Sequence, residues 1–501
     1  MKQLYIISAL LLLSNWAYSQ SLDEAVKFSR TSNLGSARSA AMGGAFGALG
    51  GDISSLNTNP AGVGVFRKSE IAFTPSLNFS HIESGHGSIS KNSFQVGQLG
   101  AVFSFYSPNF DWKGINFGIN YTNLNNFNKK TDRLIDYSTT SITNVWAFDS
   151  YGLSPDSPDM YLESALAYKT KLIYLPPGDE NNDYFSILEV EDQNSNIFNA
   201  PVAQWQTTKE EGYQGEYSFS FGTNYKDKLY LGMSIGIQSL YYKYKSSYTE
   251  YADESLSLYL DAFQYDKHIK INGVGTNLTF GVIYRPIPEL RIGASIHTPT
   301  WYNLNYNYSA GIGAVYWATD SEIGLLNDYY SFTGDYSFDY SMRTPWRATV
   351  SLATVLQQRF ILSADYEYID YTNANYSDAD DGADYYMLNQ DMKDLLRSTH
   401  NIRLGTEYRF NSIFSLRAGY NFQASPYKND KKNNQIHAIT AGMGLNFGVF
   451  YCDAAYIHKY TKDVTYFYSG VNPFYNEVFT SLPVTNKYYD NEARLTLGVR
   501  F

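Results

Sequence analysis

Alternation with a period of two constrains the fold of this 501-residue chain more than any other feature, and residues 491–501 show it most clearly. The apolar side of this segment carries Ala493, Leu495, Leu497, Val499 and Phe501. The other side carries Arg494, Thr496, Gly498 and Arg500. Successive side chains of a strand point to opposite faces. One apolar and one cationic face suit a β-barrel wall between lipid and a polar lumen, although a soluble sandwich can alternate in the same way.

The same pattern recurs from Ser69 onward, with clear examples at residues 115–122, 229–238, 402–410 and 414–423. We count about fourteen segments of strand length, a number within the range of bacterial barrels. Short connections alternate with long polar ones, the longest of which covers residues 126–215. Outer-membrane barrels have short periplasmic turns and long extracellular loops. The sequence therefore predicts an all-β fold, a transmembrane antiparallel β-barrel of about 14 strands over residues 69–501 in the bacterial outer membrane.

Two parts precede the predicted barrel. Lys2, an apolar run over residues 4–13 and the small residues around Ser19 form the pattern of a secretory signal peptide, so we assign residues 1–19 to it. Residues 20–68 are rich in small residues and do not alternate, and they are predicted to be a separate N-terminal segment. The single cysteine, Cys452, excludes a disulfide framework and is interpreted as a packing or lipid-facing residue.

Composition narrows the possible functions. Tyr, Phe and Trp make up 17% of the chain, which favours strands and the aromatic girdles of membrane barrels. The net charge of -11 argues against nucleic acid as a partner. We find no hydrolase elbow, zinc motif or phosphate-binding loop, so no enzyme activity, metal or cofactor is expected. A group of acidic residues is interpreted as a solvated loop tip rather than a calcium site, and two histidines as loop residues. These residues are Asp378, Asp380, Asp381 and Asp384, and His81 and His86.

The segment before the predicted wall carries a distinctive pattern of glycines followed by an Asn-Pro-Ala step. The glycines are Gly43, Gly44, Gly47, Gly50 and Gly51, and the step is Asn59, Pro60 and Ala61. Glycine permits positive φ or close backbone approach, and Asn-Pro initiates a turn. The pattern resembles the N-terminal hatch of the FadL-type family of outer-membrane transporters, in a divergent, Bacteroidetes-like form. The resemblance is specific over residues 35–77 and rests elsewhere on length, strand number and the terminal Phe501.

The resemblance implies a function and partners. It implies a barrel, gated by the hatch at residues 20–68, that carries long-chain fatty acids or aromatic hydrocarbons and releases them sideways through a defect in the wall. The irregular segments around Pro345 and at Ile269–Arg285 are candidates for that defect. A shuttle or structural role in type IX protein secretion is the alternative, and a plain porin is a third. We expect a monomer whose partners are outer-membrane lipid, a hydrophobic ligand and, through the strand ending in Phe501, the barrel-assembly machinery.

Two further groups of residues are candidates for ligand contact. The long connection contains apolar residues that could capture hydrophobic ligand or could pack within the loop, namely Leu166, Leu172, Ile173, Tyr174 and Leu175. Inward-facing charges of both signs gather in the later strands, namely Asp365, Glu367, Arg403, Glu407, Arg409, Arg417, Asp453, Arg494 and Arg500. We interpret them as an ion-pair network joining wall and hatch rather than as a site for a substrate carboxylate, although an arginine fork would suit one.

Overall fold

The computed structural model describes residues 21–32, 34–85, 87–157, 160–179, 181–191, 197–317, 327–377, 385–472 and 477–501. The fold is a closed antiparallel β-barrel of fourteen strands, as the sequence predicts. The wall closes where β1 (Glu70–Ser84) pairs with β25 (Val484–Arg500), with Glu70 opposite Arg500 and Ser84 opposite Asn486. The predicted signal peptide, the acidic group at residues 378–384 and His86 lie outside the described residues. His81, predicted to be a loop residue, lies instead in a strand, where it pairs with Ser90.

The fourteen wall strands follow one another around the barrel in chain order. Several of them are interrupted and consist of two labelled segments. They are β1 (Glu70–Ser84), β2 (Gly87–Tyr106), β3 (Trp112–Asn126) with β4 (Lys129–Ser138), β9 (Val202–Tyr225), β10 (Leu229–Ala252), β11 (Leu260–Ile287), β12 (Leu290–His297) with β13 (Trp301–Tyr316), β15 (Tyr336–Arg343) with β16 (Arg347–Leu356), β17 (Phe360–Asp370) with β18 (Asn375–Ser377), β19 (Ser398–Arg409), β20 (Phe414–Gln423), β21 (Ile436–Asn446), β22 (Phe450–Thr465) and β25 (Val484–Arg500).

Helices and short strands lie before the wall and in its long connections. The first group is α2 (Leu22–Ser29), α3 (Ala37–Ala41), α4 (Ser55–Thr58) and η1 (Pro60–Val65). The second is α5 (Ile142–Ser150), α6 (Leu162–Lys169), η2 (Tyr371–Asn373), α7 (Tyr386–Leu395), β5 (Ile173–Tyr174), β6 (Phe185–Ser186), β7 (Glu189–Glu191), β8 (Ile197–Asn199), β14 (Asp328–Phe332), β23 (Ser469–Asn472) and β24 (Glu477–Thr480). None of the described helices is long and apolar enough to cross a membrane.

Alternation in the sequence becomes two different faces of the wall. On β10 the side chains of Leu231 and Met233 are exposed on the outside, whereas Ser234 and Gln238 are buried inside. On β25 Leu495 is likewise exposed, and Arg494 is only 4% exposed. An apolar outer face and a polar interior are the distribution that lipid outside and a polar lumen inside require. Cys452 is a half-buried free thiol on β22.

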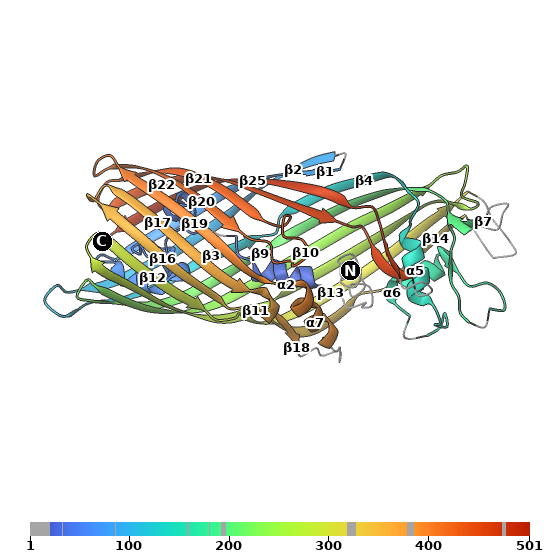
Figure 1. Cartoon of the computed structure of the whole chain (residues 1–501), viewed down its shortest axis with the longest axis horizontal. Helices are drawn as coiled ribbons and strands as arrows, with labels where there is room; N and C mark the ends of the chain where they lie inside the picture. The colour runs from blue at the N-terminus through green and yellow to red at the C-terminus, as the bar shows by residue number, and fades with distance from the viewer. Residues whose placement is uncertain are drawn as a thin grey trace.

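The two ends of the barrel differ. Figure 1 shows short turns and the C-terminus at one end, and α5 and α6 with the long connections at the other. The short turns mark the periplasmic end and the long connections the extracellular end. Strands β9, β10 and β11 contain 24, 24 and 28 residues, although about 9–11 residues are enough to cross the bilayer. These strands therefore continue well beyond the membrane on the extracellular side.

This extension corrects the sequence-based assignment of residues 126–215 to one long loop. Residues 129–138 form β4, and residues 202–215 form the first part of β9. A strand beyond the bilayer does not need an apolar outer face. Polar residues therefore replace the apolar ones there, and the sequence lacks the alternation by which the other strands are predicted. Residues Ile269–Arg285 are also more regular than predicted, because β11 pairs with β10 without interruption from Ala262 to Tyr284.

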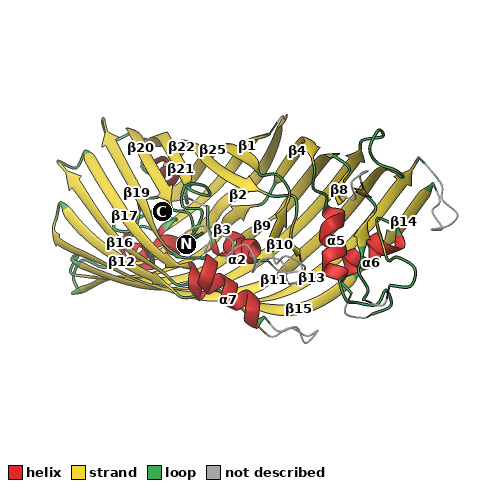
Figure 2. Ribbon diagram, turned by 45° about the vertical axis from the view of Figure 1, so that its right-hand side comes forward, coloured by secondary structure: helices red, strands yellow, loops and turns green. Residues whose placement is uncertain are grey.

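The described part of residues 21–66, which we call the N-terminal segment, lies inside the barrel (Figure 2). Helix α2 begins at its N-cap Ser21, whose hydroxyl accepts from the Glu24 amide at 3.1 Å. It buries Val26 and Phe28 in a large apolar cluster with side chains of α5, α6 and α7. Helix α3 packs nearer the periplasmic end, where Ala37, Ala40 and Ala41 form a second cluster with wall residues.

Candidate functional site

The Asn-Pro-Ala step joins the N-terminal segment to the wall. Asn59 donates from its amide nitrogen to the carbonyl of Gly47 at 2.6 Å and to the wall carbonyls of Val282 and Ala294, each at 3.3 Å. Its side-chain oxygen accepts from the Ala61 amide at 3.1 Å, which caps η1. One side chain thus links three segments of the chain.

The wall meets this step with a row of glycines. Gly222, Gly232 and Gly281 are directly paired on β9, β10 and β11. A Cβ atom at Gly232 would overlap the backbone of Pro60, and one at Gly281 would overlap the Asn59 amide oxygen. Glycine in a strand interior marks a close approach of another backbone. The N-terminal segment therefore fits against bare wall backbone.

A second glycine pair supports the segment from other strands. Gly405 on β19 pairs with Gly419 on β20, and a Cβ atom at either would collide with Met42 or Gly43. The Thr440 hydroxyl fixes the same turn, because it accepts from the Gly43 amide and donates to the Ala41 carbonyl, both at 3.0 Å. Two separate parts of the wall hold the segment.

The five glycines singled out in the sequence fall into two kinds. Gly43, Gly44, Gly50 and Gly51 have φ between 62° and 79°, a conformation that other residues rarely adopt. Gly47 has no positive φ; its amide donates to the Asp365 carboxylate at 3.0 Å, and a Cβ atom there would overlap the Ser351 hydroxyl. Four of the glycines form turns, and the fifth permits close contact with the wall.

Buried ion pairs join the same parts, as the distribution of charge in the sequence predicts. Glu407 accepts from Arg38 of α3 at 2.9 Å and from Arg409 and Arg417 of the wall, each at 2.7 Å. Arg417 also pairs with Asp453 at 2.6 Å. Further pairs join Arg403 to Glu367, Arg494 to Glu492 and Arg500 to Glu70. Arg38, Glu70 and Glu492 complete the network, and none of them is among the charges predicted to face inward.

The wall has a gap between β2 and the strand formed by β3 and β4. Pairing of β2 with β3 ends at Gln98 and Thr122. Beyond this point, among the described residues, β2 pairs only with β1 and β3–β4 pairs only with β9. Side chains bridge the two edges instead, since Asn123 donates to Gln95 at 3.1 Å and Asn126 to Ser93 at 3.0 Å. The gap is neither of the two irregular segments that the sequence suggested.

The N-terminal segment lies directly behind this gap. The β3–β9 pairing shifts by one residue between Asn123 and Asn125, which leaves Leu124 as an extra residue in the strand. The Leu124 carbonyl accepts from the Ser32 amide at 3.1 Å. Asn125 donates to the Arg30 carbonyl at 2.6 Å. One backbone carbonyl and one side chain at the edge of the gap therefore bond to the N-terminal segment.

Aromatic rings connect the gap to the large apolar cluster that α2 forms with α5, α6 and α7 at the extracellular end. The ring centroid of Phe28 in α2 lies 5.9 Å from that of Phe127, which follows β3, and 5.7 Å from that of Tyr242 in β10. The ring centroids of Phe127 and Tyr242 are 5.4 Å apart. Lys27 also binds Glu210 and the Tyr242 hydroxyl, each at 2.7 Å. Helix α2 is thus attached to the wall beside the gap.

The apolar residues of the predicted capture loop lie at the extracellular end. Leu166, Leu172 and Ile173 are buried in the same cluster as Phe28, and Tyr174 and Leu175 pack at its border. They do not lie beside the Asn-Pro-Ala step, which contacts β10, β11 and β12. In this conformation they form part of a packed core rather than an open groove. The described residues contain no group of three or more side chains suited to hold a metal ion.

The closed wall with its apolar outer face defines a β-barrel of the bacterial outer membrane. Residues 227–465 match the model of a family described as outer membrane protein transport protein (OMPP1/FadL/TodX). A comparison with curated protein sequences finds no significant match. The chain is similar to FadL/TodX-like transport barrels, and neither the family nor the structures that it matches point to the secretion alternative.

Two solved structures illustrate the likeness in fold. A FadL homologue from Pseudomonas aeruginosa superposes with a TM-score of 0.54 at 14% identity, over 93% of this chain and 98% of that chain. The toluene transporter TodX from Pseudomonas putida gives a TM-score of 0.52 at 12% identity, over 94% of this chain and 100% of that chain. At this identity the comparison establishes the fold alone.

Proposed function

We propose that the protein transports hydrophobic small molecules, such as long-chain fatty acids or aromatic hydrocarbons, across the outer membrane, with residues 21–66 acting as a hatch. The matched family is described by transport, and a structure of the same fold is described as a toluene transporter. The observation that carries the proposal is the gap between β2 and β3–β4, because the hatch itself satisfies the Leu124 carbonyl at its edge.

The proposed route begins in the extracellular aromatic cluster. Its largest fully buried side chains include Tyr302, Tyr306, Tyr340 and Tyr376. Burial of apolar ligand surface there contributes about 25 cal/mol per Å². A ligand ring or acyl chain can replace Phe28 against Phe127 and Tyr242, since it offers the same apolar contact. Displacement of α2 then removes the bonds that the hatch makes beside the gap.

The ligand leaves through the gap into the bilayer. Side-chain hydrogen bonds from Asn123 and Asn126 join the two edges, and each contributes about 0.5–1.5 kcal/mol. Separating fully paired strands would instead break a ladder of backbone bonds and leave polar groups unsatisfied in lipid. The gap is therefore the part of this stretch of wall that opens at the lowest cost.

A disulfide across the gap tests this route. In a Cys452→Ala background, Gln95→Cys with Asn123→Cys links two side chains that now share a hydrogen bond. We expect the oxidised protein to lose uptake of oleate or toluene into proteoliposomes, and reduction to restore it. Deletion of residues 21–66 should instead make the barrel leaky to sugars.

A matched control places the disulfide where the strands are already paired. Gln98→Cys with Thr122→Cys joins the last paired position of β2 and β3. This disulfide should leave uptake unchanged. Full uptake with the gap closed, or equal loss in both oxidised proteins, would contradict the proposed exit.

A further inference from the structure

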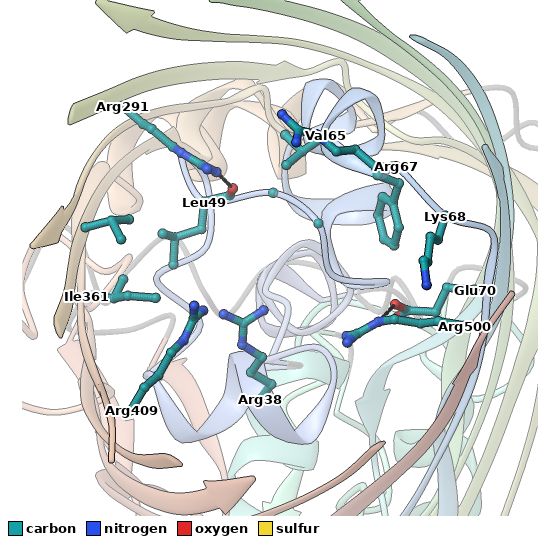
Figure 3. A pocket seen from close by; sticks show the side chains of 14 residues that line it. Arg38, Leu49, Val65, Arg67, Lys68, Glu70, Arg291, Ile361, Arg409 and Arg500 are labelled. Carbon is teal, nitrogen blue, oxygen red and sulfur yellow. Dashed lines mark hydrogen bonds and ion pairs between the residues drawn. The ribbon is translucent and has the colours of Figure 1, made fainter. Parts of the chain in front are cut away.

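The periplasmic end of the barrel contains a strongly cationic hollow. Two adjoining cavities between the N-terminal segment and the wall are lined by eight arginine and lysine side chains and only three acidic ones, although the whole chain has a net charge of -11. Short turns line one side of it, including Gln357 to Arg359 and Asn411 to Ile413. We call this hollow the basin, and Figure 3 shows the first of its cavities.

The acidic residues of the basin do not balance its cations. Glu407 is shared by Arg38, Arg409 and Arg417, and Arg417 also uses Asp453. Glu70 is occupied by Arg500 at 2.8 Å. A purely structural network would place one carboxylate against each guanidinium, because an unpaired buried charge is costly. The basin retains a surplus of positive charge.

Arg291 carries much of this surplus. Its guanidinium donates to the Leu49 carbonyl, a neutral acceptor. Its Nε atom is buried without a hydrogen-bond partner, and no acidic side chain pairs with it among the residues that the structure describes. Figure 3 shows Arg291, Arg38 and Arg409 around one hollow. Arg291 and Arg409 extend into it from the wall, and Arg38 from α3. These groups can bind an oxyanion from several directions.

One side of the basin is apolar. Leu49, Val355 and Ile361 line the first cavity, and they belong to a cluster with Phe46 and neighbouring hatch residues. The cavity has a volume of about 370 Å³, within the range of small-ligand sites. It therefore offers both cationic groups and an apolar surface to a ligand.

We propose that the basin binds the carboxylate head group of an amphiphile from the periplasmic side, with Arg291, Arg38 and Arg409 around the carboxylate and the first methylenes against Leu49 and Ile361. Arginine forks match carboxylate geometry and form strong charge-assisted bonds. This site goes beyond the proposed route, because it lies at the end of the barrel opposite to α5 and α6.

Native mass spectrometry of the complete detergent-purified barrel tests the site with decanoate, decanol and inorganic phosphate. We expect one decanoate to bind about tenfold more tightly than decanol or phosphate, since only decanoate uses both sides of the basin. Equal binding of decanol would show that the cations contribute nothing. Equal binding of phosphate would show that the apolar side contributes nothing. Either result would overturn the proposal.

Substitution of Arg291 separates binding from folding. Arg291→Gln leaves no acidic group unpaired, so the barrel should still shift in mobility between boiled and unboiled gels while decanoate binding falls about tenfold. Arg409→Gln is a second variant should the first fail to fold. Arg343→Gln makes the same change at an exposed arginine of β15 outside the basin and should bind normally. Unchanged decanoate binding in Arg291→Gln, or an equal loss in Arg343→Gln, would refute the site.

Crosslinking with a photoreactive decanoate shows where the ligand binds and tests the basin separately from the transport route. Labelling of peptides that contain Leu49, Val355 or Ile361 would support the basin. Labelling confined to α2, α5 and α6 would overturn it and leave the transport proposal standing. Loss of uptake in the gap-closed variant concerns the route alone and does not depend on the basin.

Discussion

The two parts of the N-terminal segment are attached to the barrel in different ways. Residues 36–66 rest on paired wall glycines and on the buried Arg38–Glu407 pair. Residues 21–32 depend on ring contacts of Phe28, on the partly exposed Lys27–Glu210 ion pair and on hydrogen bonds from Arg30 and Ser32. Close backbone fit resists movement because it cannot be lost gradually, whereas apolar contacts can be exchanged for ligand. We therefore expect residues 36–66, the lower part toward the periplasmic end, to stay in place, and residues 21–32, the upper part toward the extracellular end, to move more easily.

Removal of the charge at the centre of the lower part should have the largest effect. Glu407→Gln leaves Arg38, Arg409 and Arg417 without their shared carboxylate. Loss of one partner of a buried pair costs about 3–5 kcal/mol. We expect a lower temperature for the change in gel mobility and a higher conductance in planar bilayers as residues 36–66 loosen.

The control for this variant is an exposed ion pair of the wall. Glu83 lies 3.4 Å from Lys487, and both side chains are nearly half exposed. Glu83→Gln should change stability by less than about 1 kcal/mol. If Glu407→Gln were as stable as Glu83→Gln, the lower part would not be held by its ion pairs.

The upper part should respond to pH through Glu24. Burial raises the pKa of the Glu24 carboxyl to about 7, although the nearby Lys27 ammonium lowers it. Because the pKa is higher in the docked helix than in water, docking is strongest below pH 4.5 and weakens by up to about 3 kcal/mol as the pH rises to 7. Hydrogen exchange of residues 21–30, corrected for intrinsic rate, should be faster at pH 8 than at pH 5.

Glu24→Gln provides the matched test, because glutamine keeps the shape of the side chain and does not titrate. Its exchange in residues 21–30 should be the same at both pH values, and residues 36–66 should show no dependence in either protein. A pH effect that persists in Glu24→Gln would exclude this carboxyl as its source.

A single methyl group on the glycine row should have a smaller effect. Gly232→Ala places a Cβ atom against Pro60, and overpacking of this kind costs about 1–3 kcal/mol. Limited proteolysis should cut residues 36–66 faster. Gly114→Ala is the control, since the nearest atom to its Cβ would be 3.6 Å away. Equal proteolysis of both variants would mean that the close fit at Gly232 does not hold the segment.

Local patterns predict the barrel well, because lipid outside and polar groups inside impose alternation on each strand separately. Leu231, Met233 and Ser234 fall on the faces that the sequence predicts. The glycine row is different. Gly232 is visible in the alternation of β10, but its pairing with Gly222 and Gly281 depends on the register of three strands.

The gap could not be predicted from sequence for a similar reason. The polar residues 129–138 do not have the pattern of a wall strand, and only the three-dimensional register shows that residues 87–97 and 123–138 do not pair with each other. The basin itself is not among the sequence-based predictions. Arg409 and Arg500 were assigned to the interior, whereas Arg291 follows a short turn and was not included among the inward-facing charges.

The seam between β1 and β25 has a consequence for biogenesis. The first of the described wall strands, β1, is joined to the last, β25, and Glu70 lies against Arg500. Residues 21–66 precede this seam and fill the space that it encloses. The wall therefore cannot close around these residues until β25 has been made.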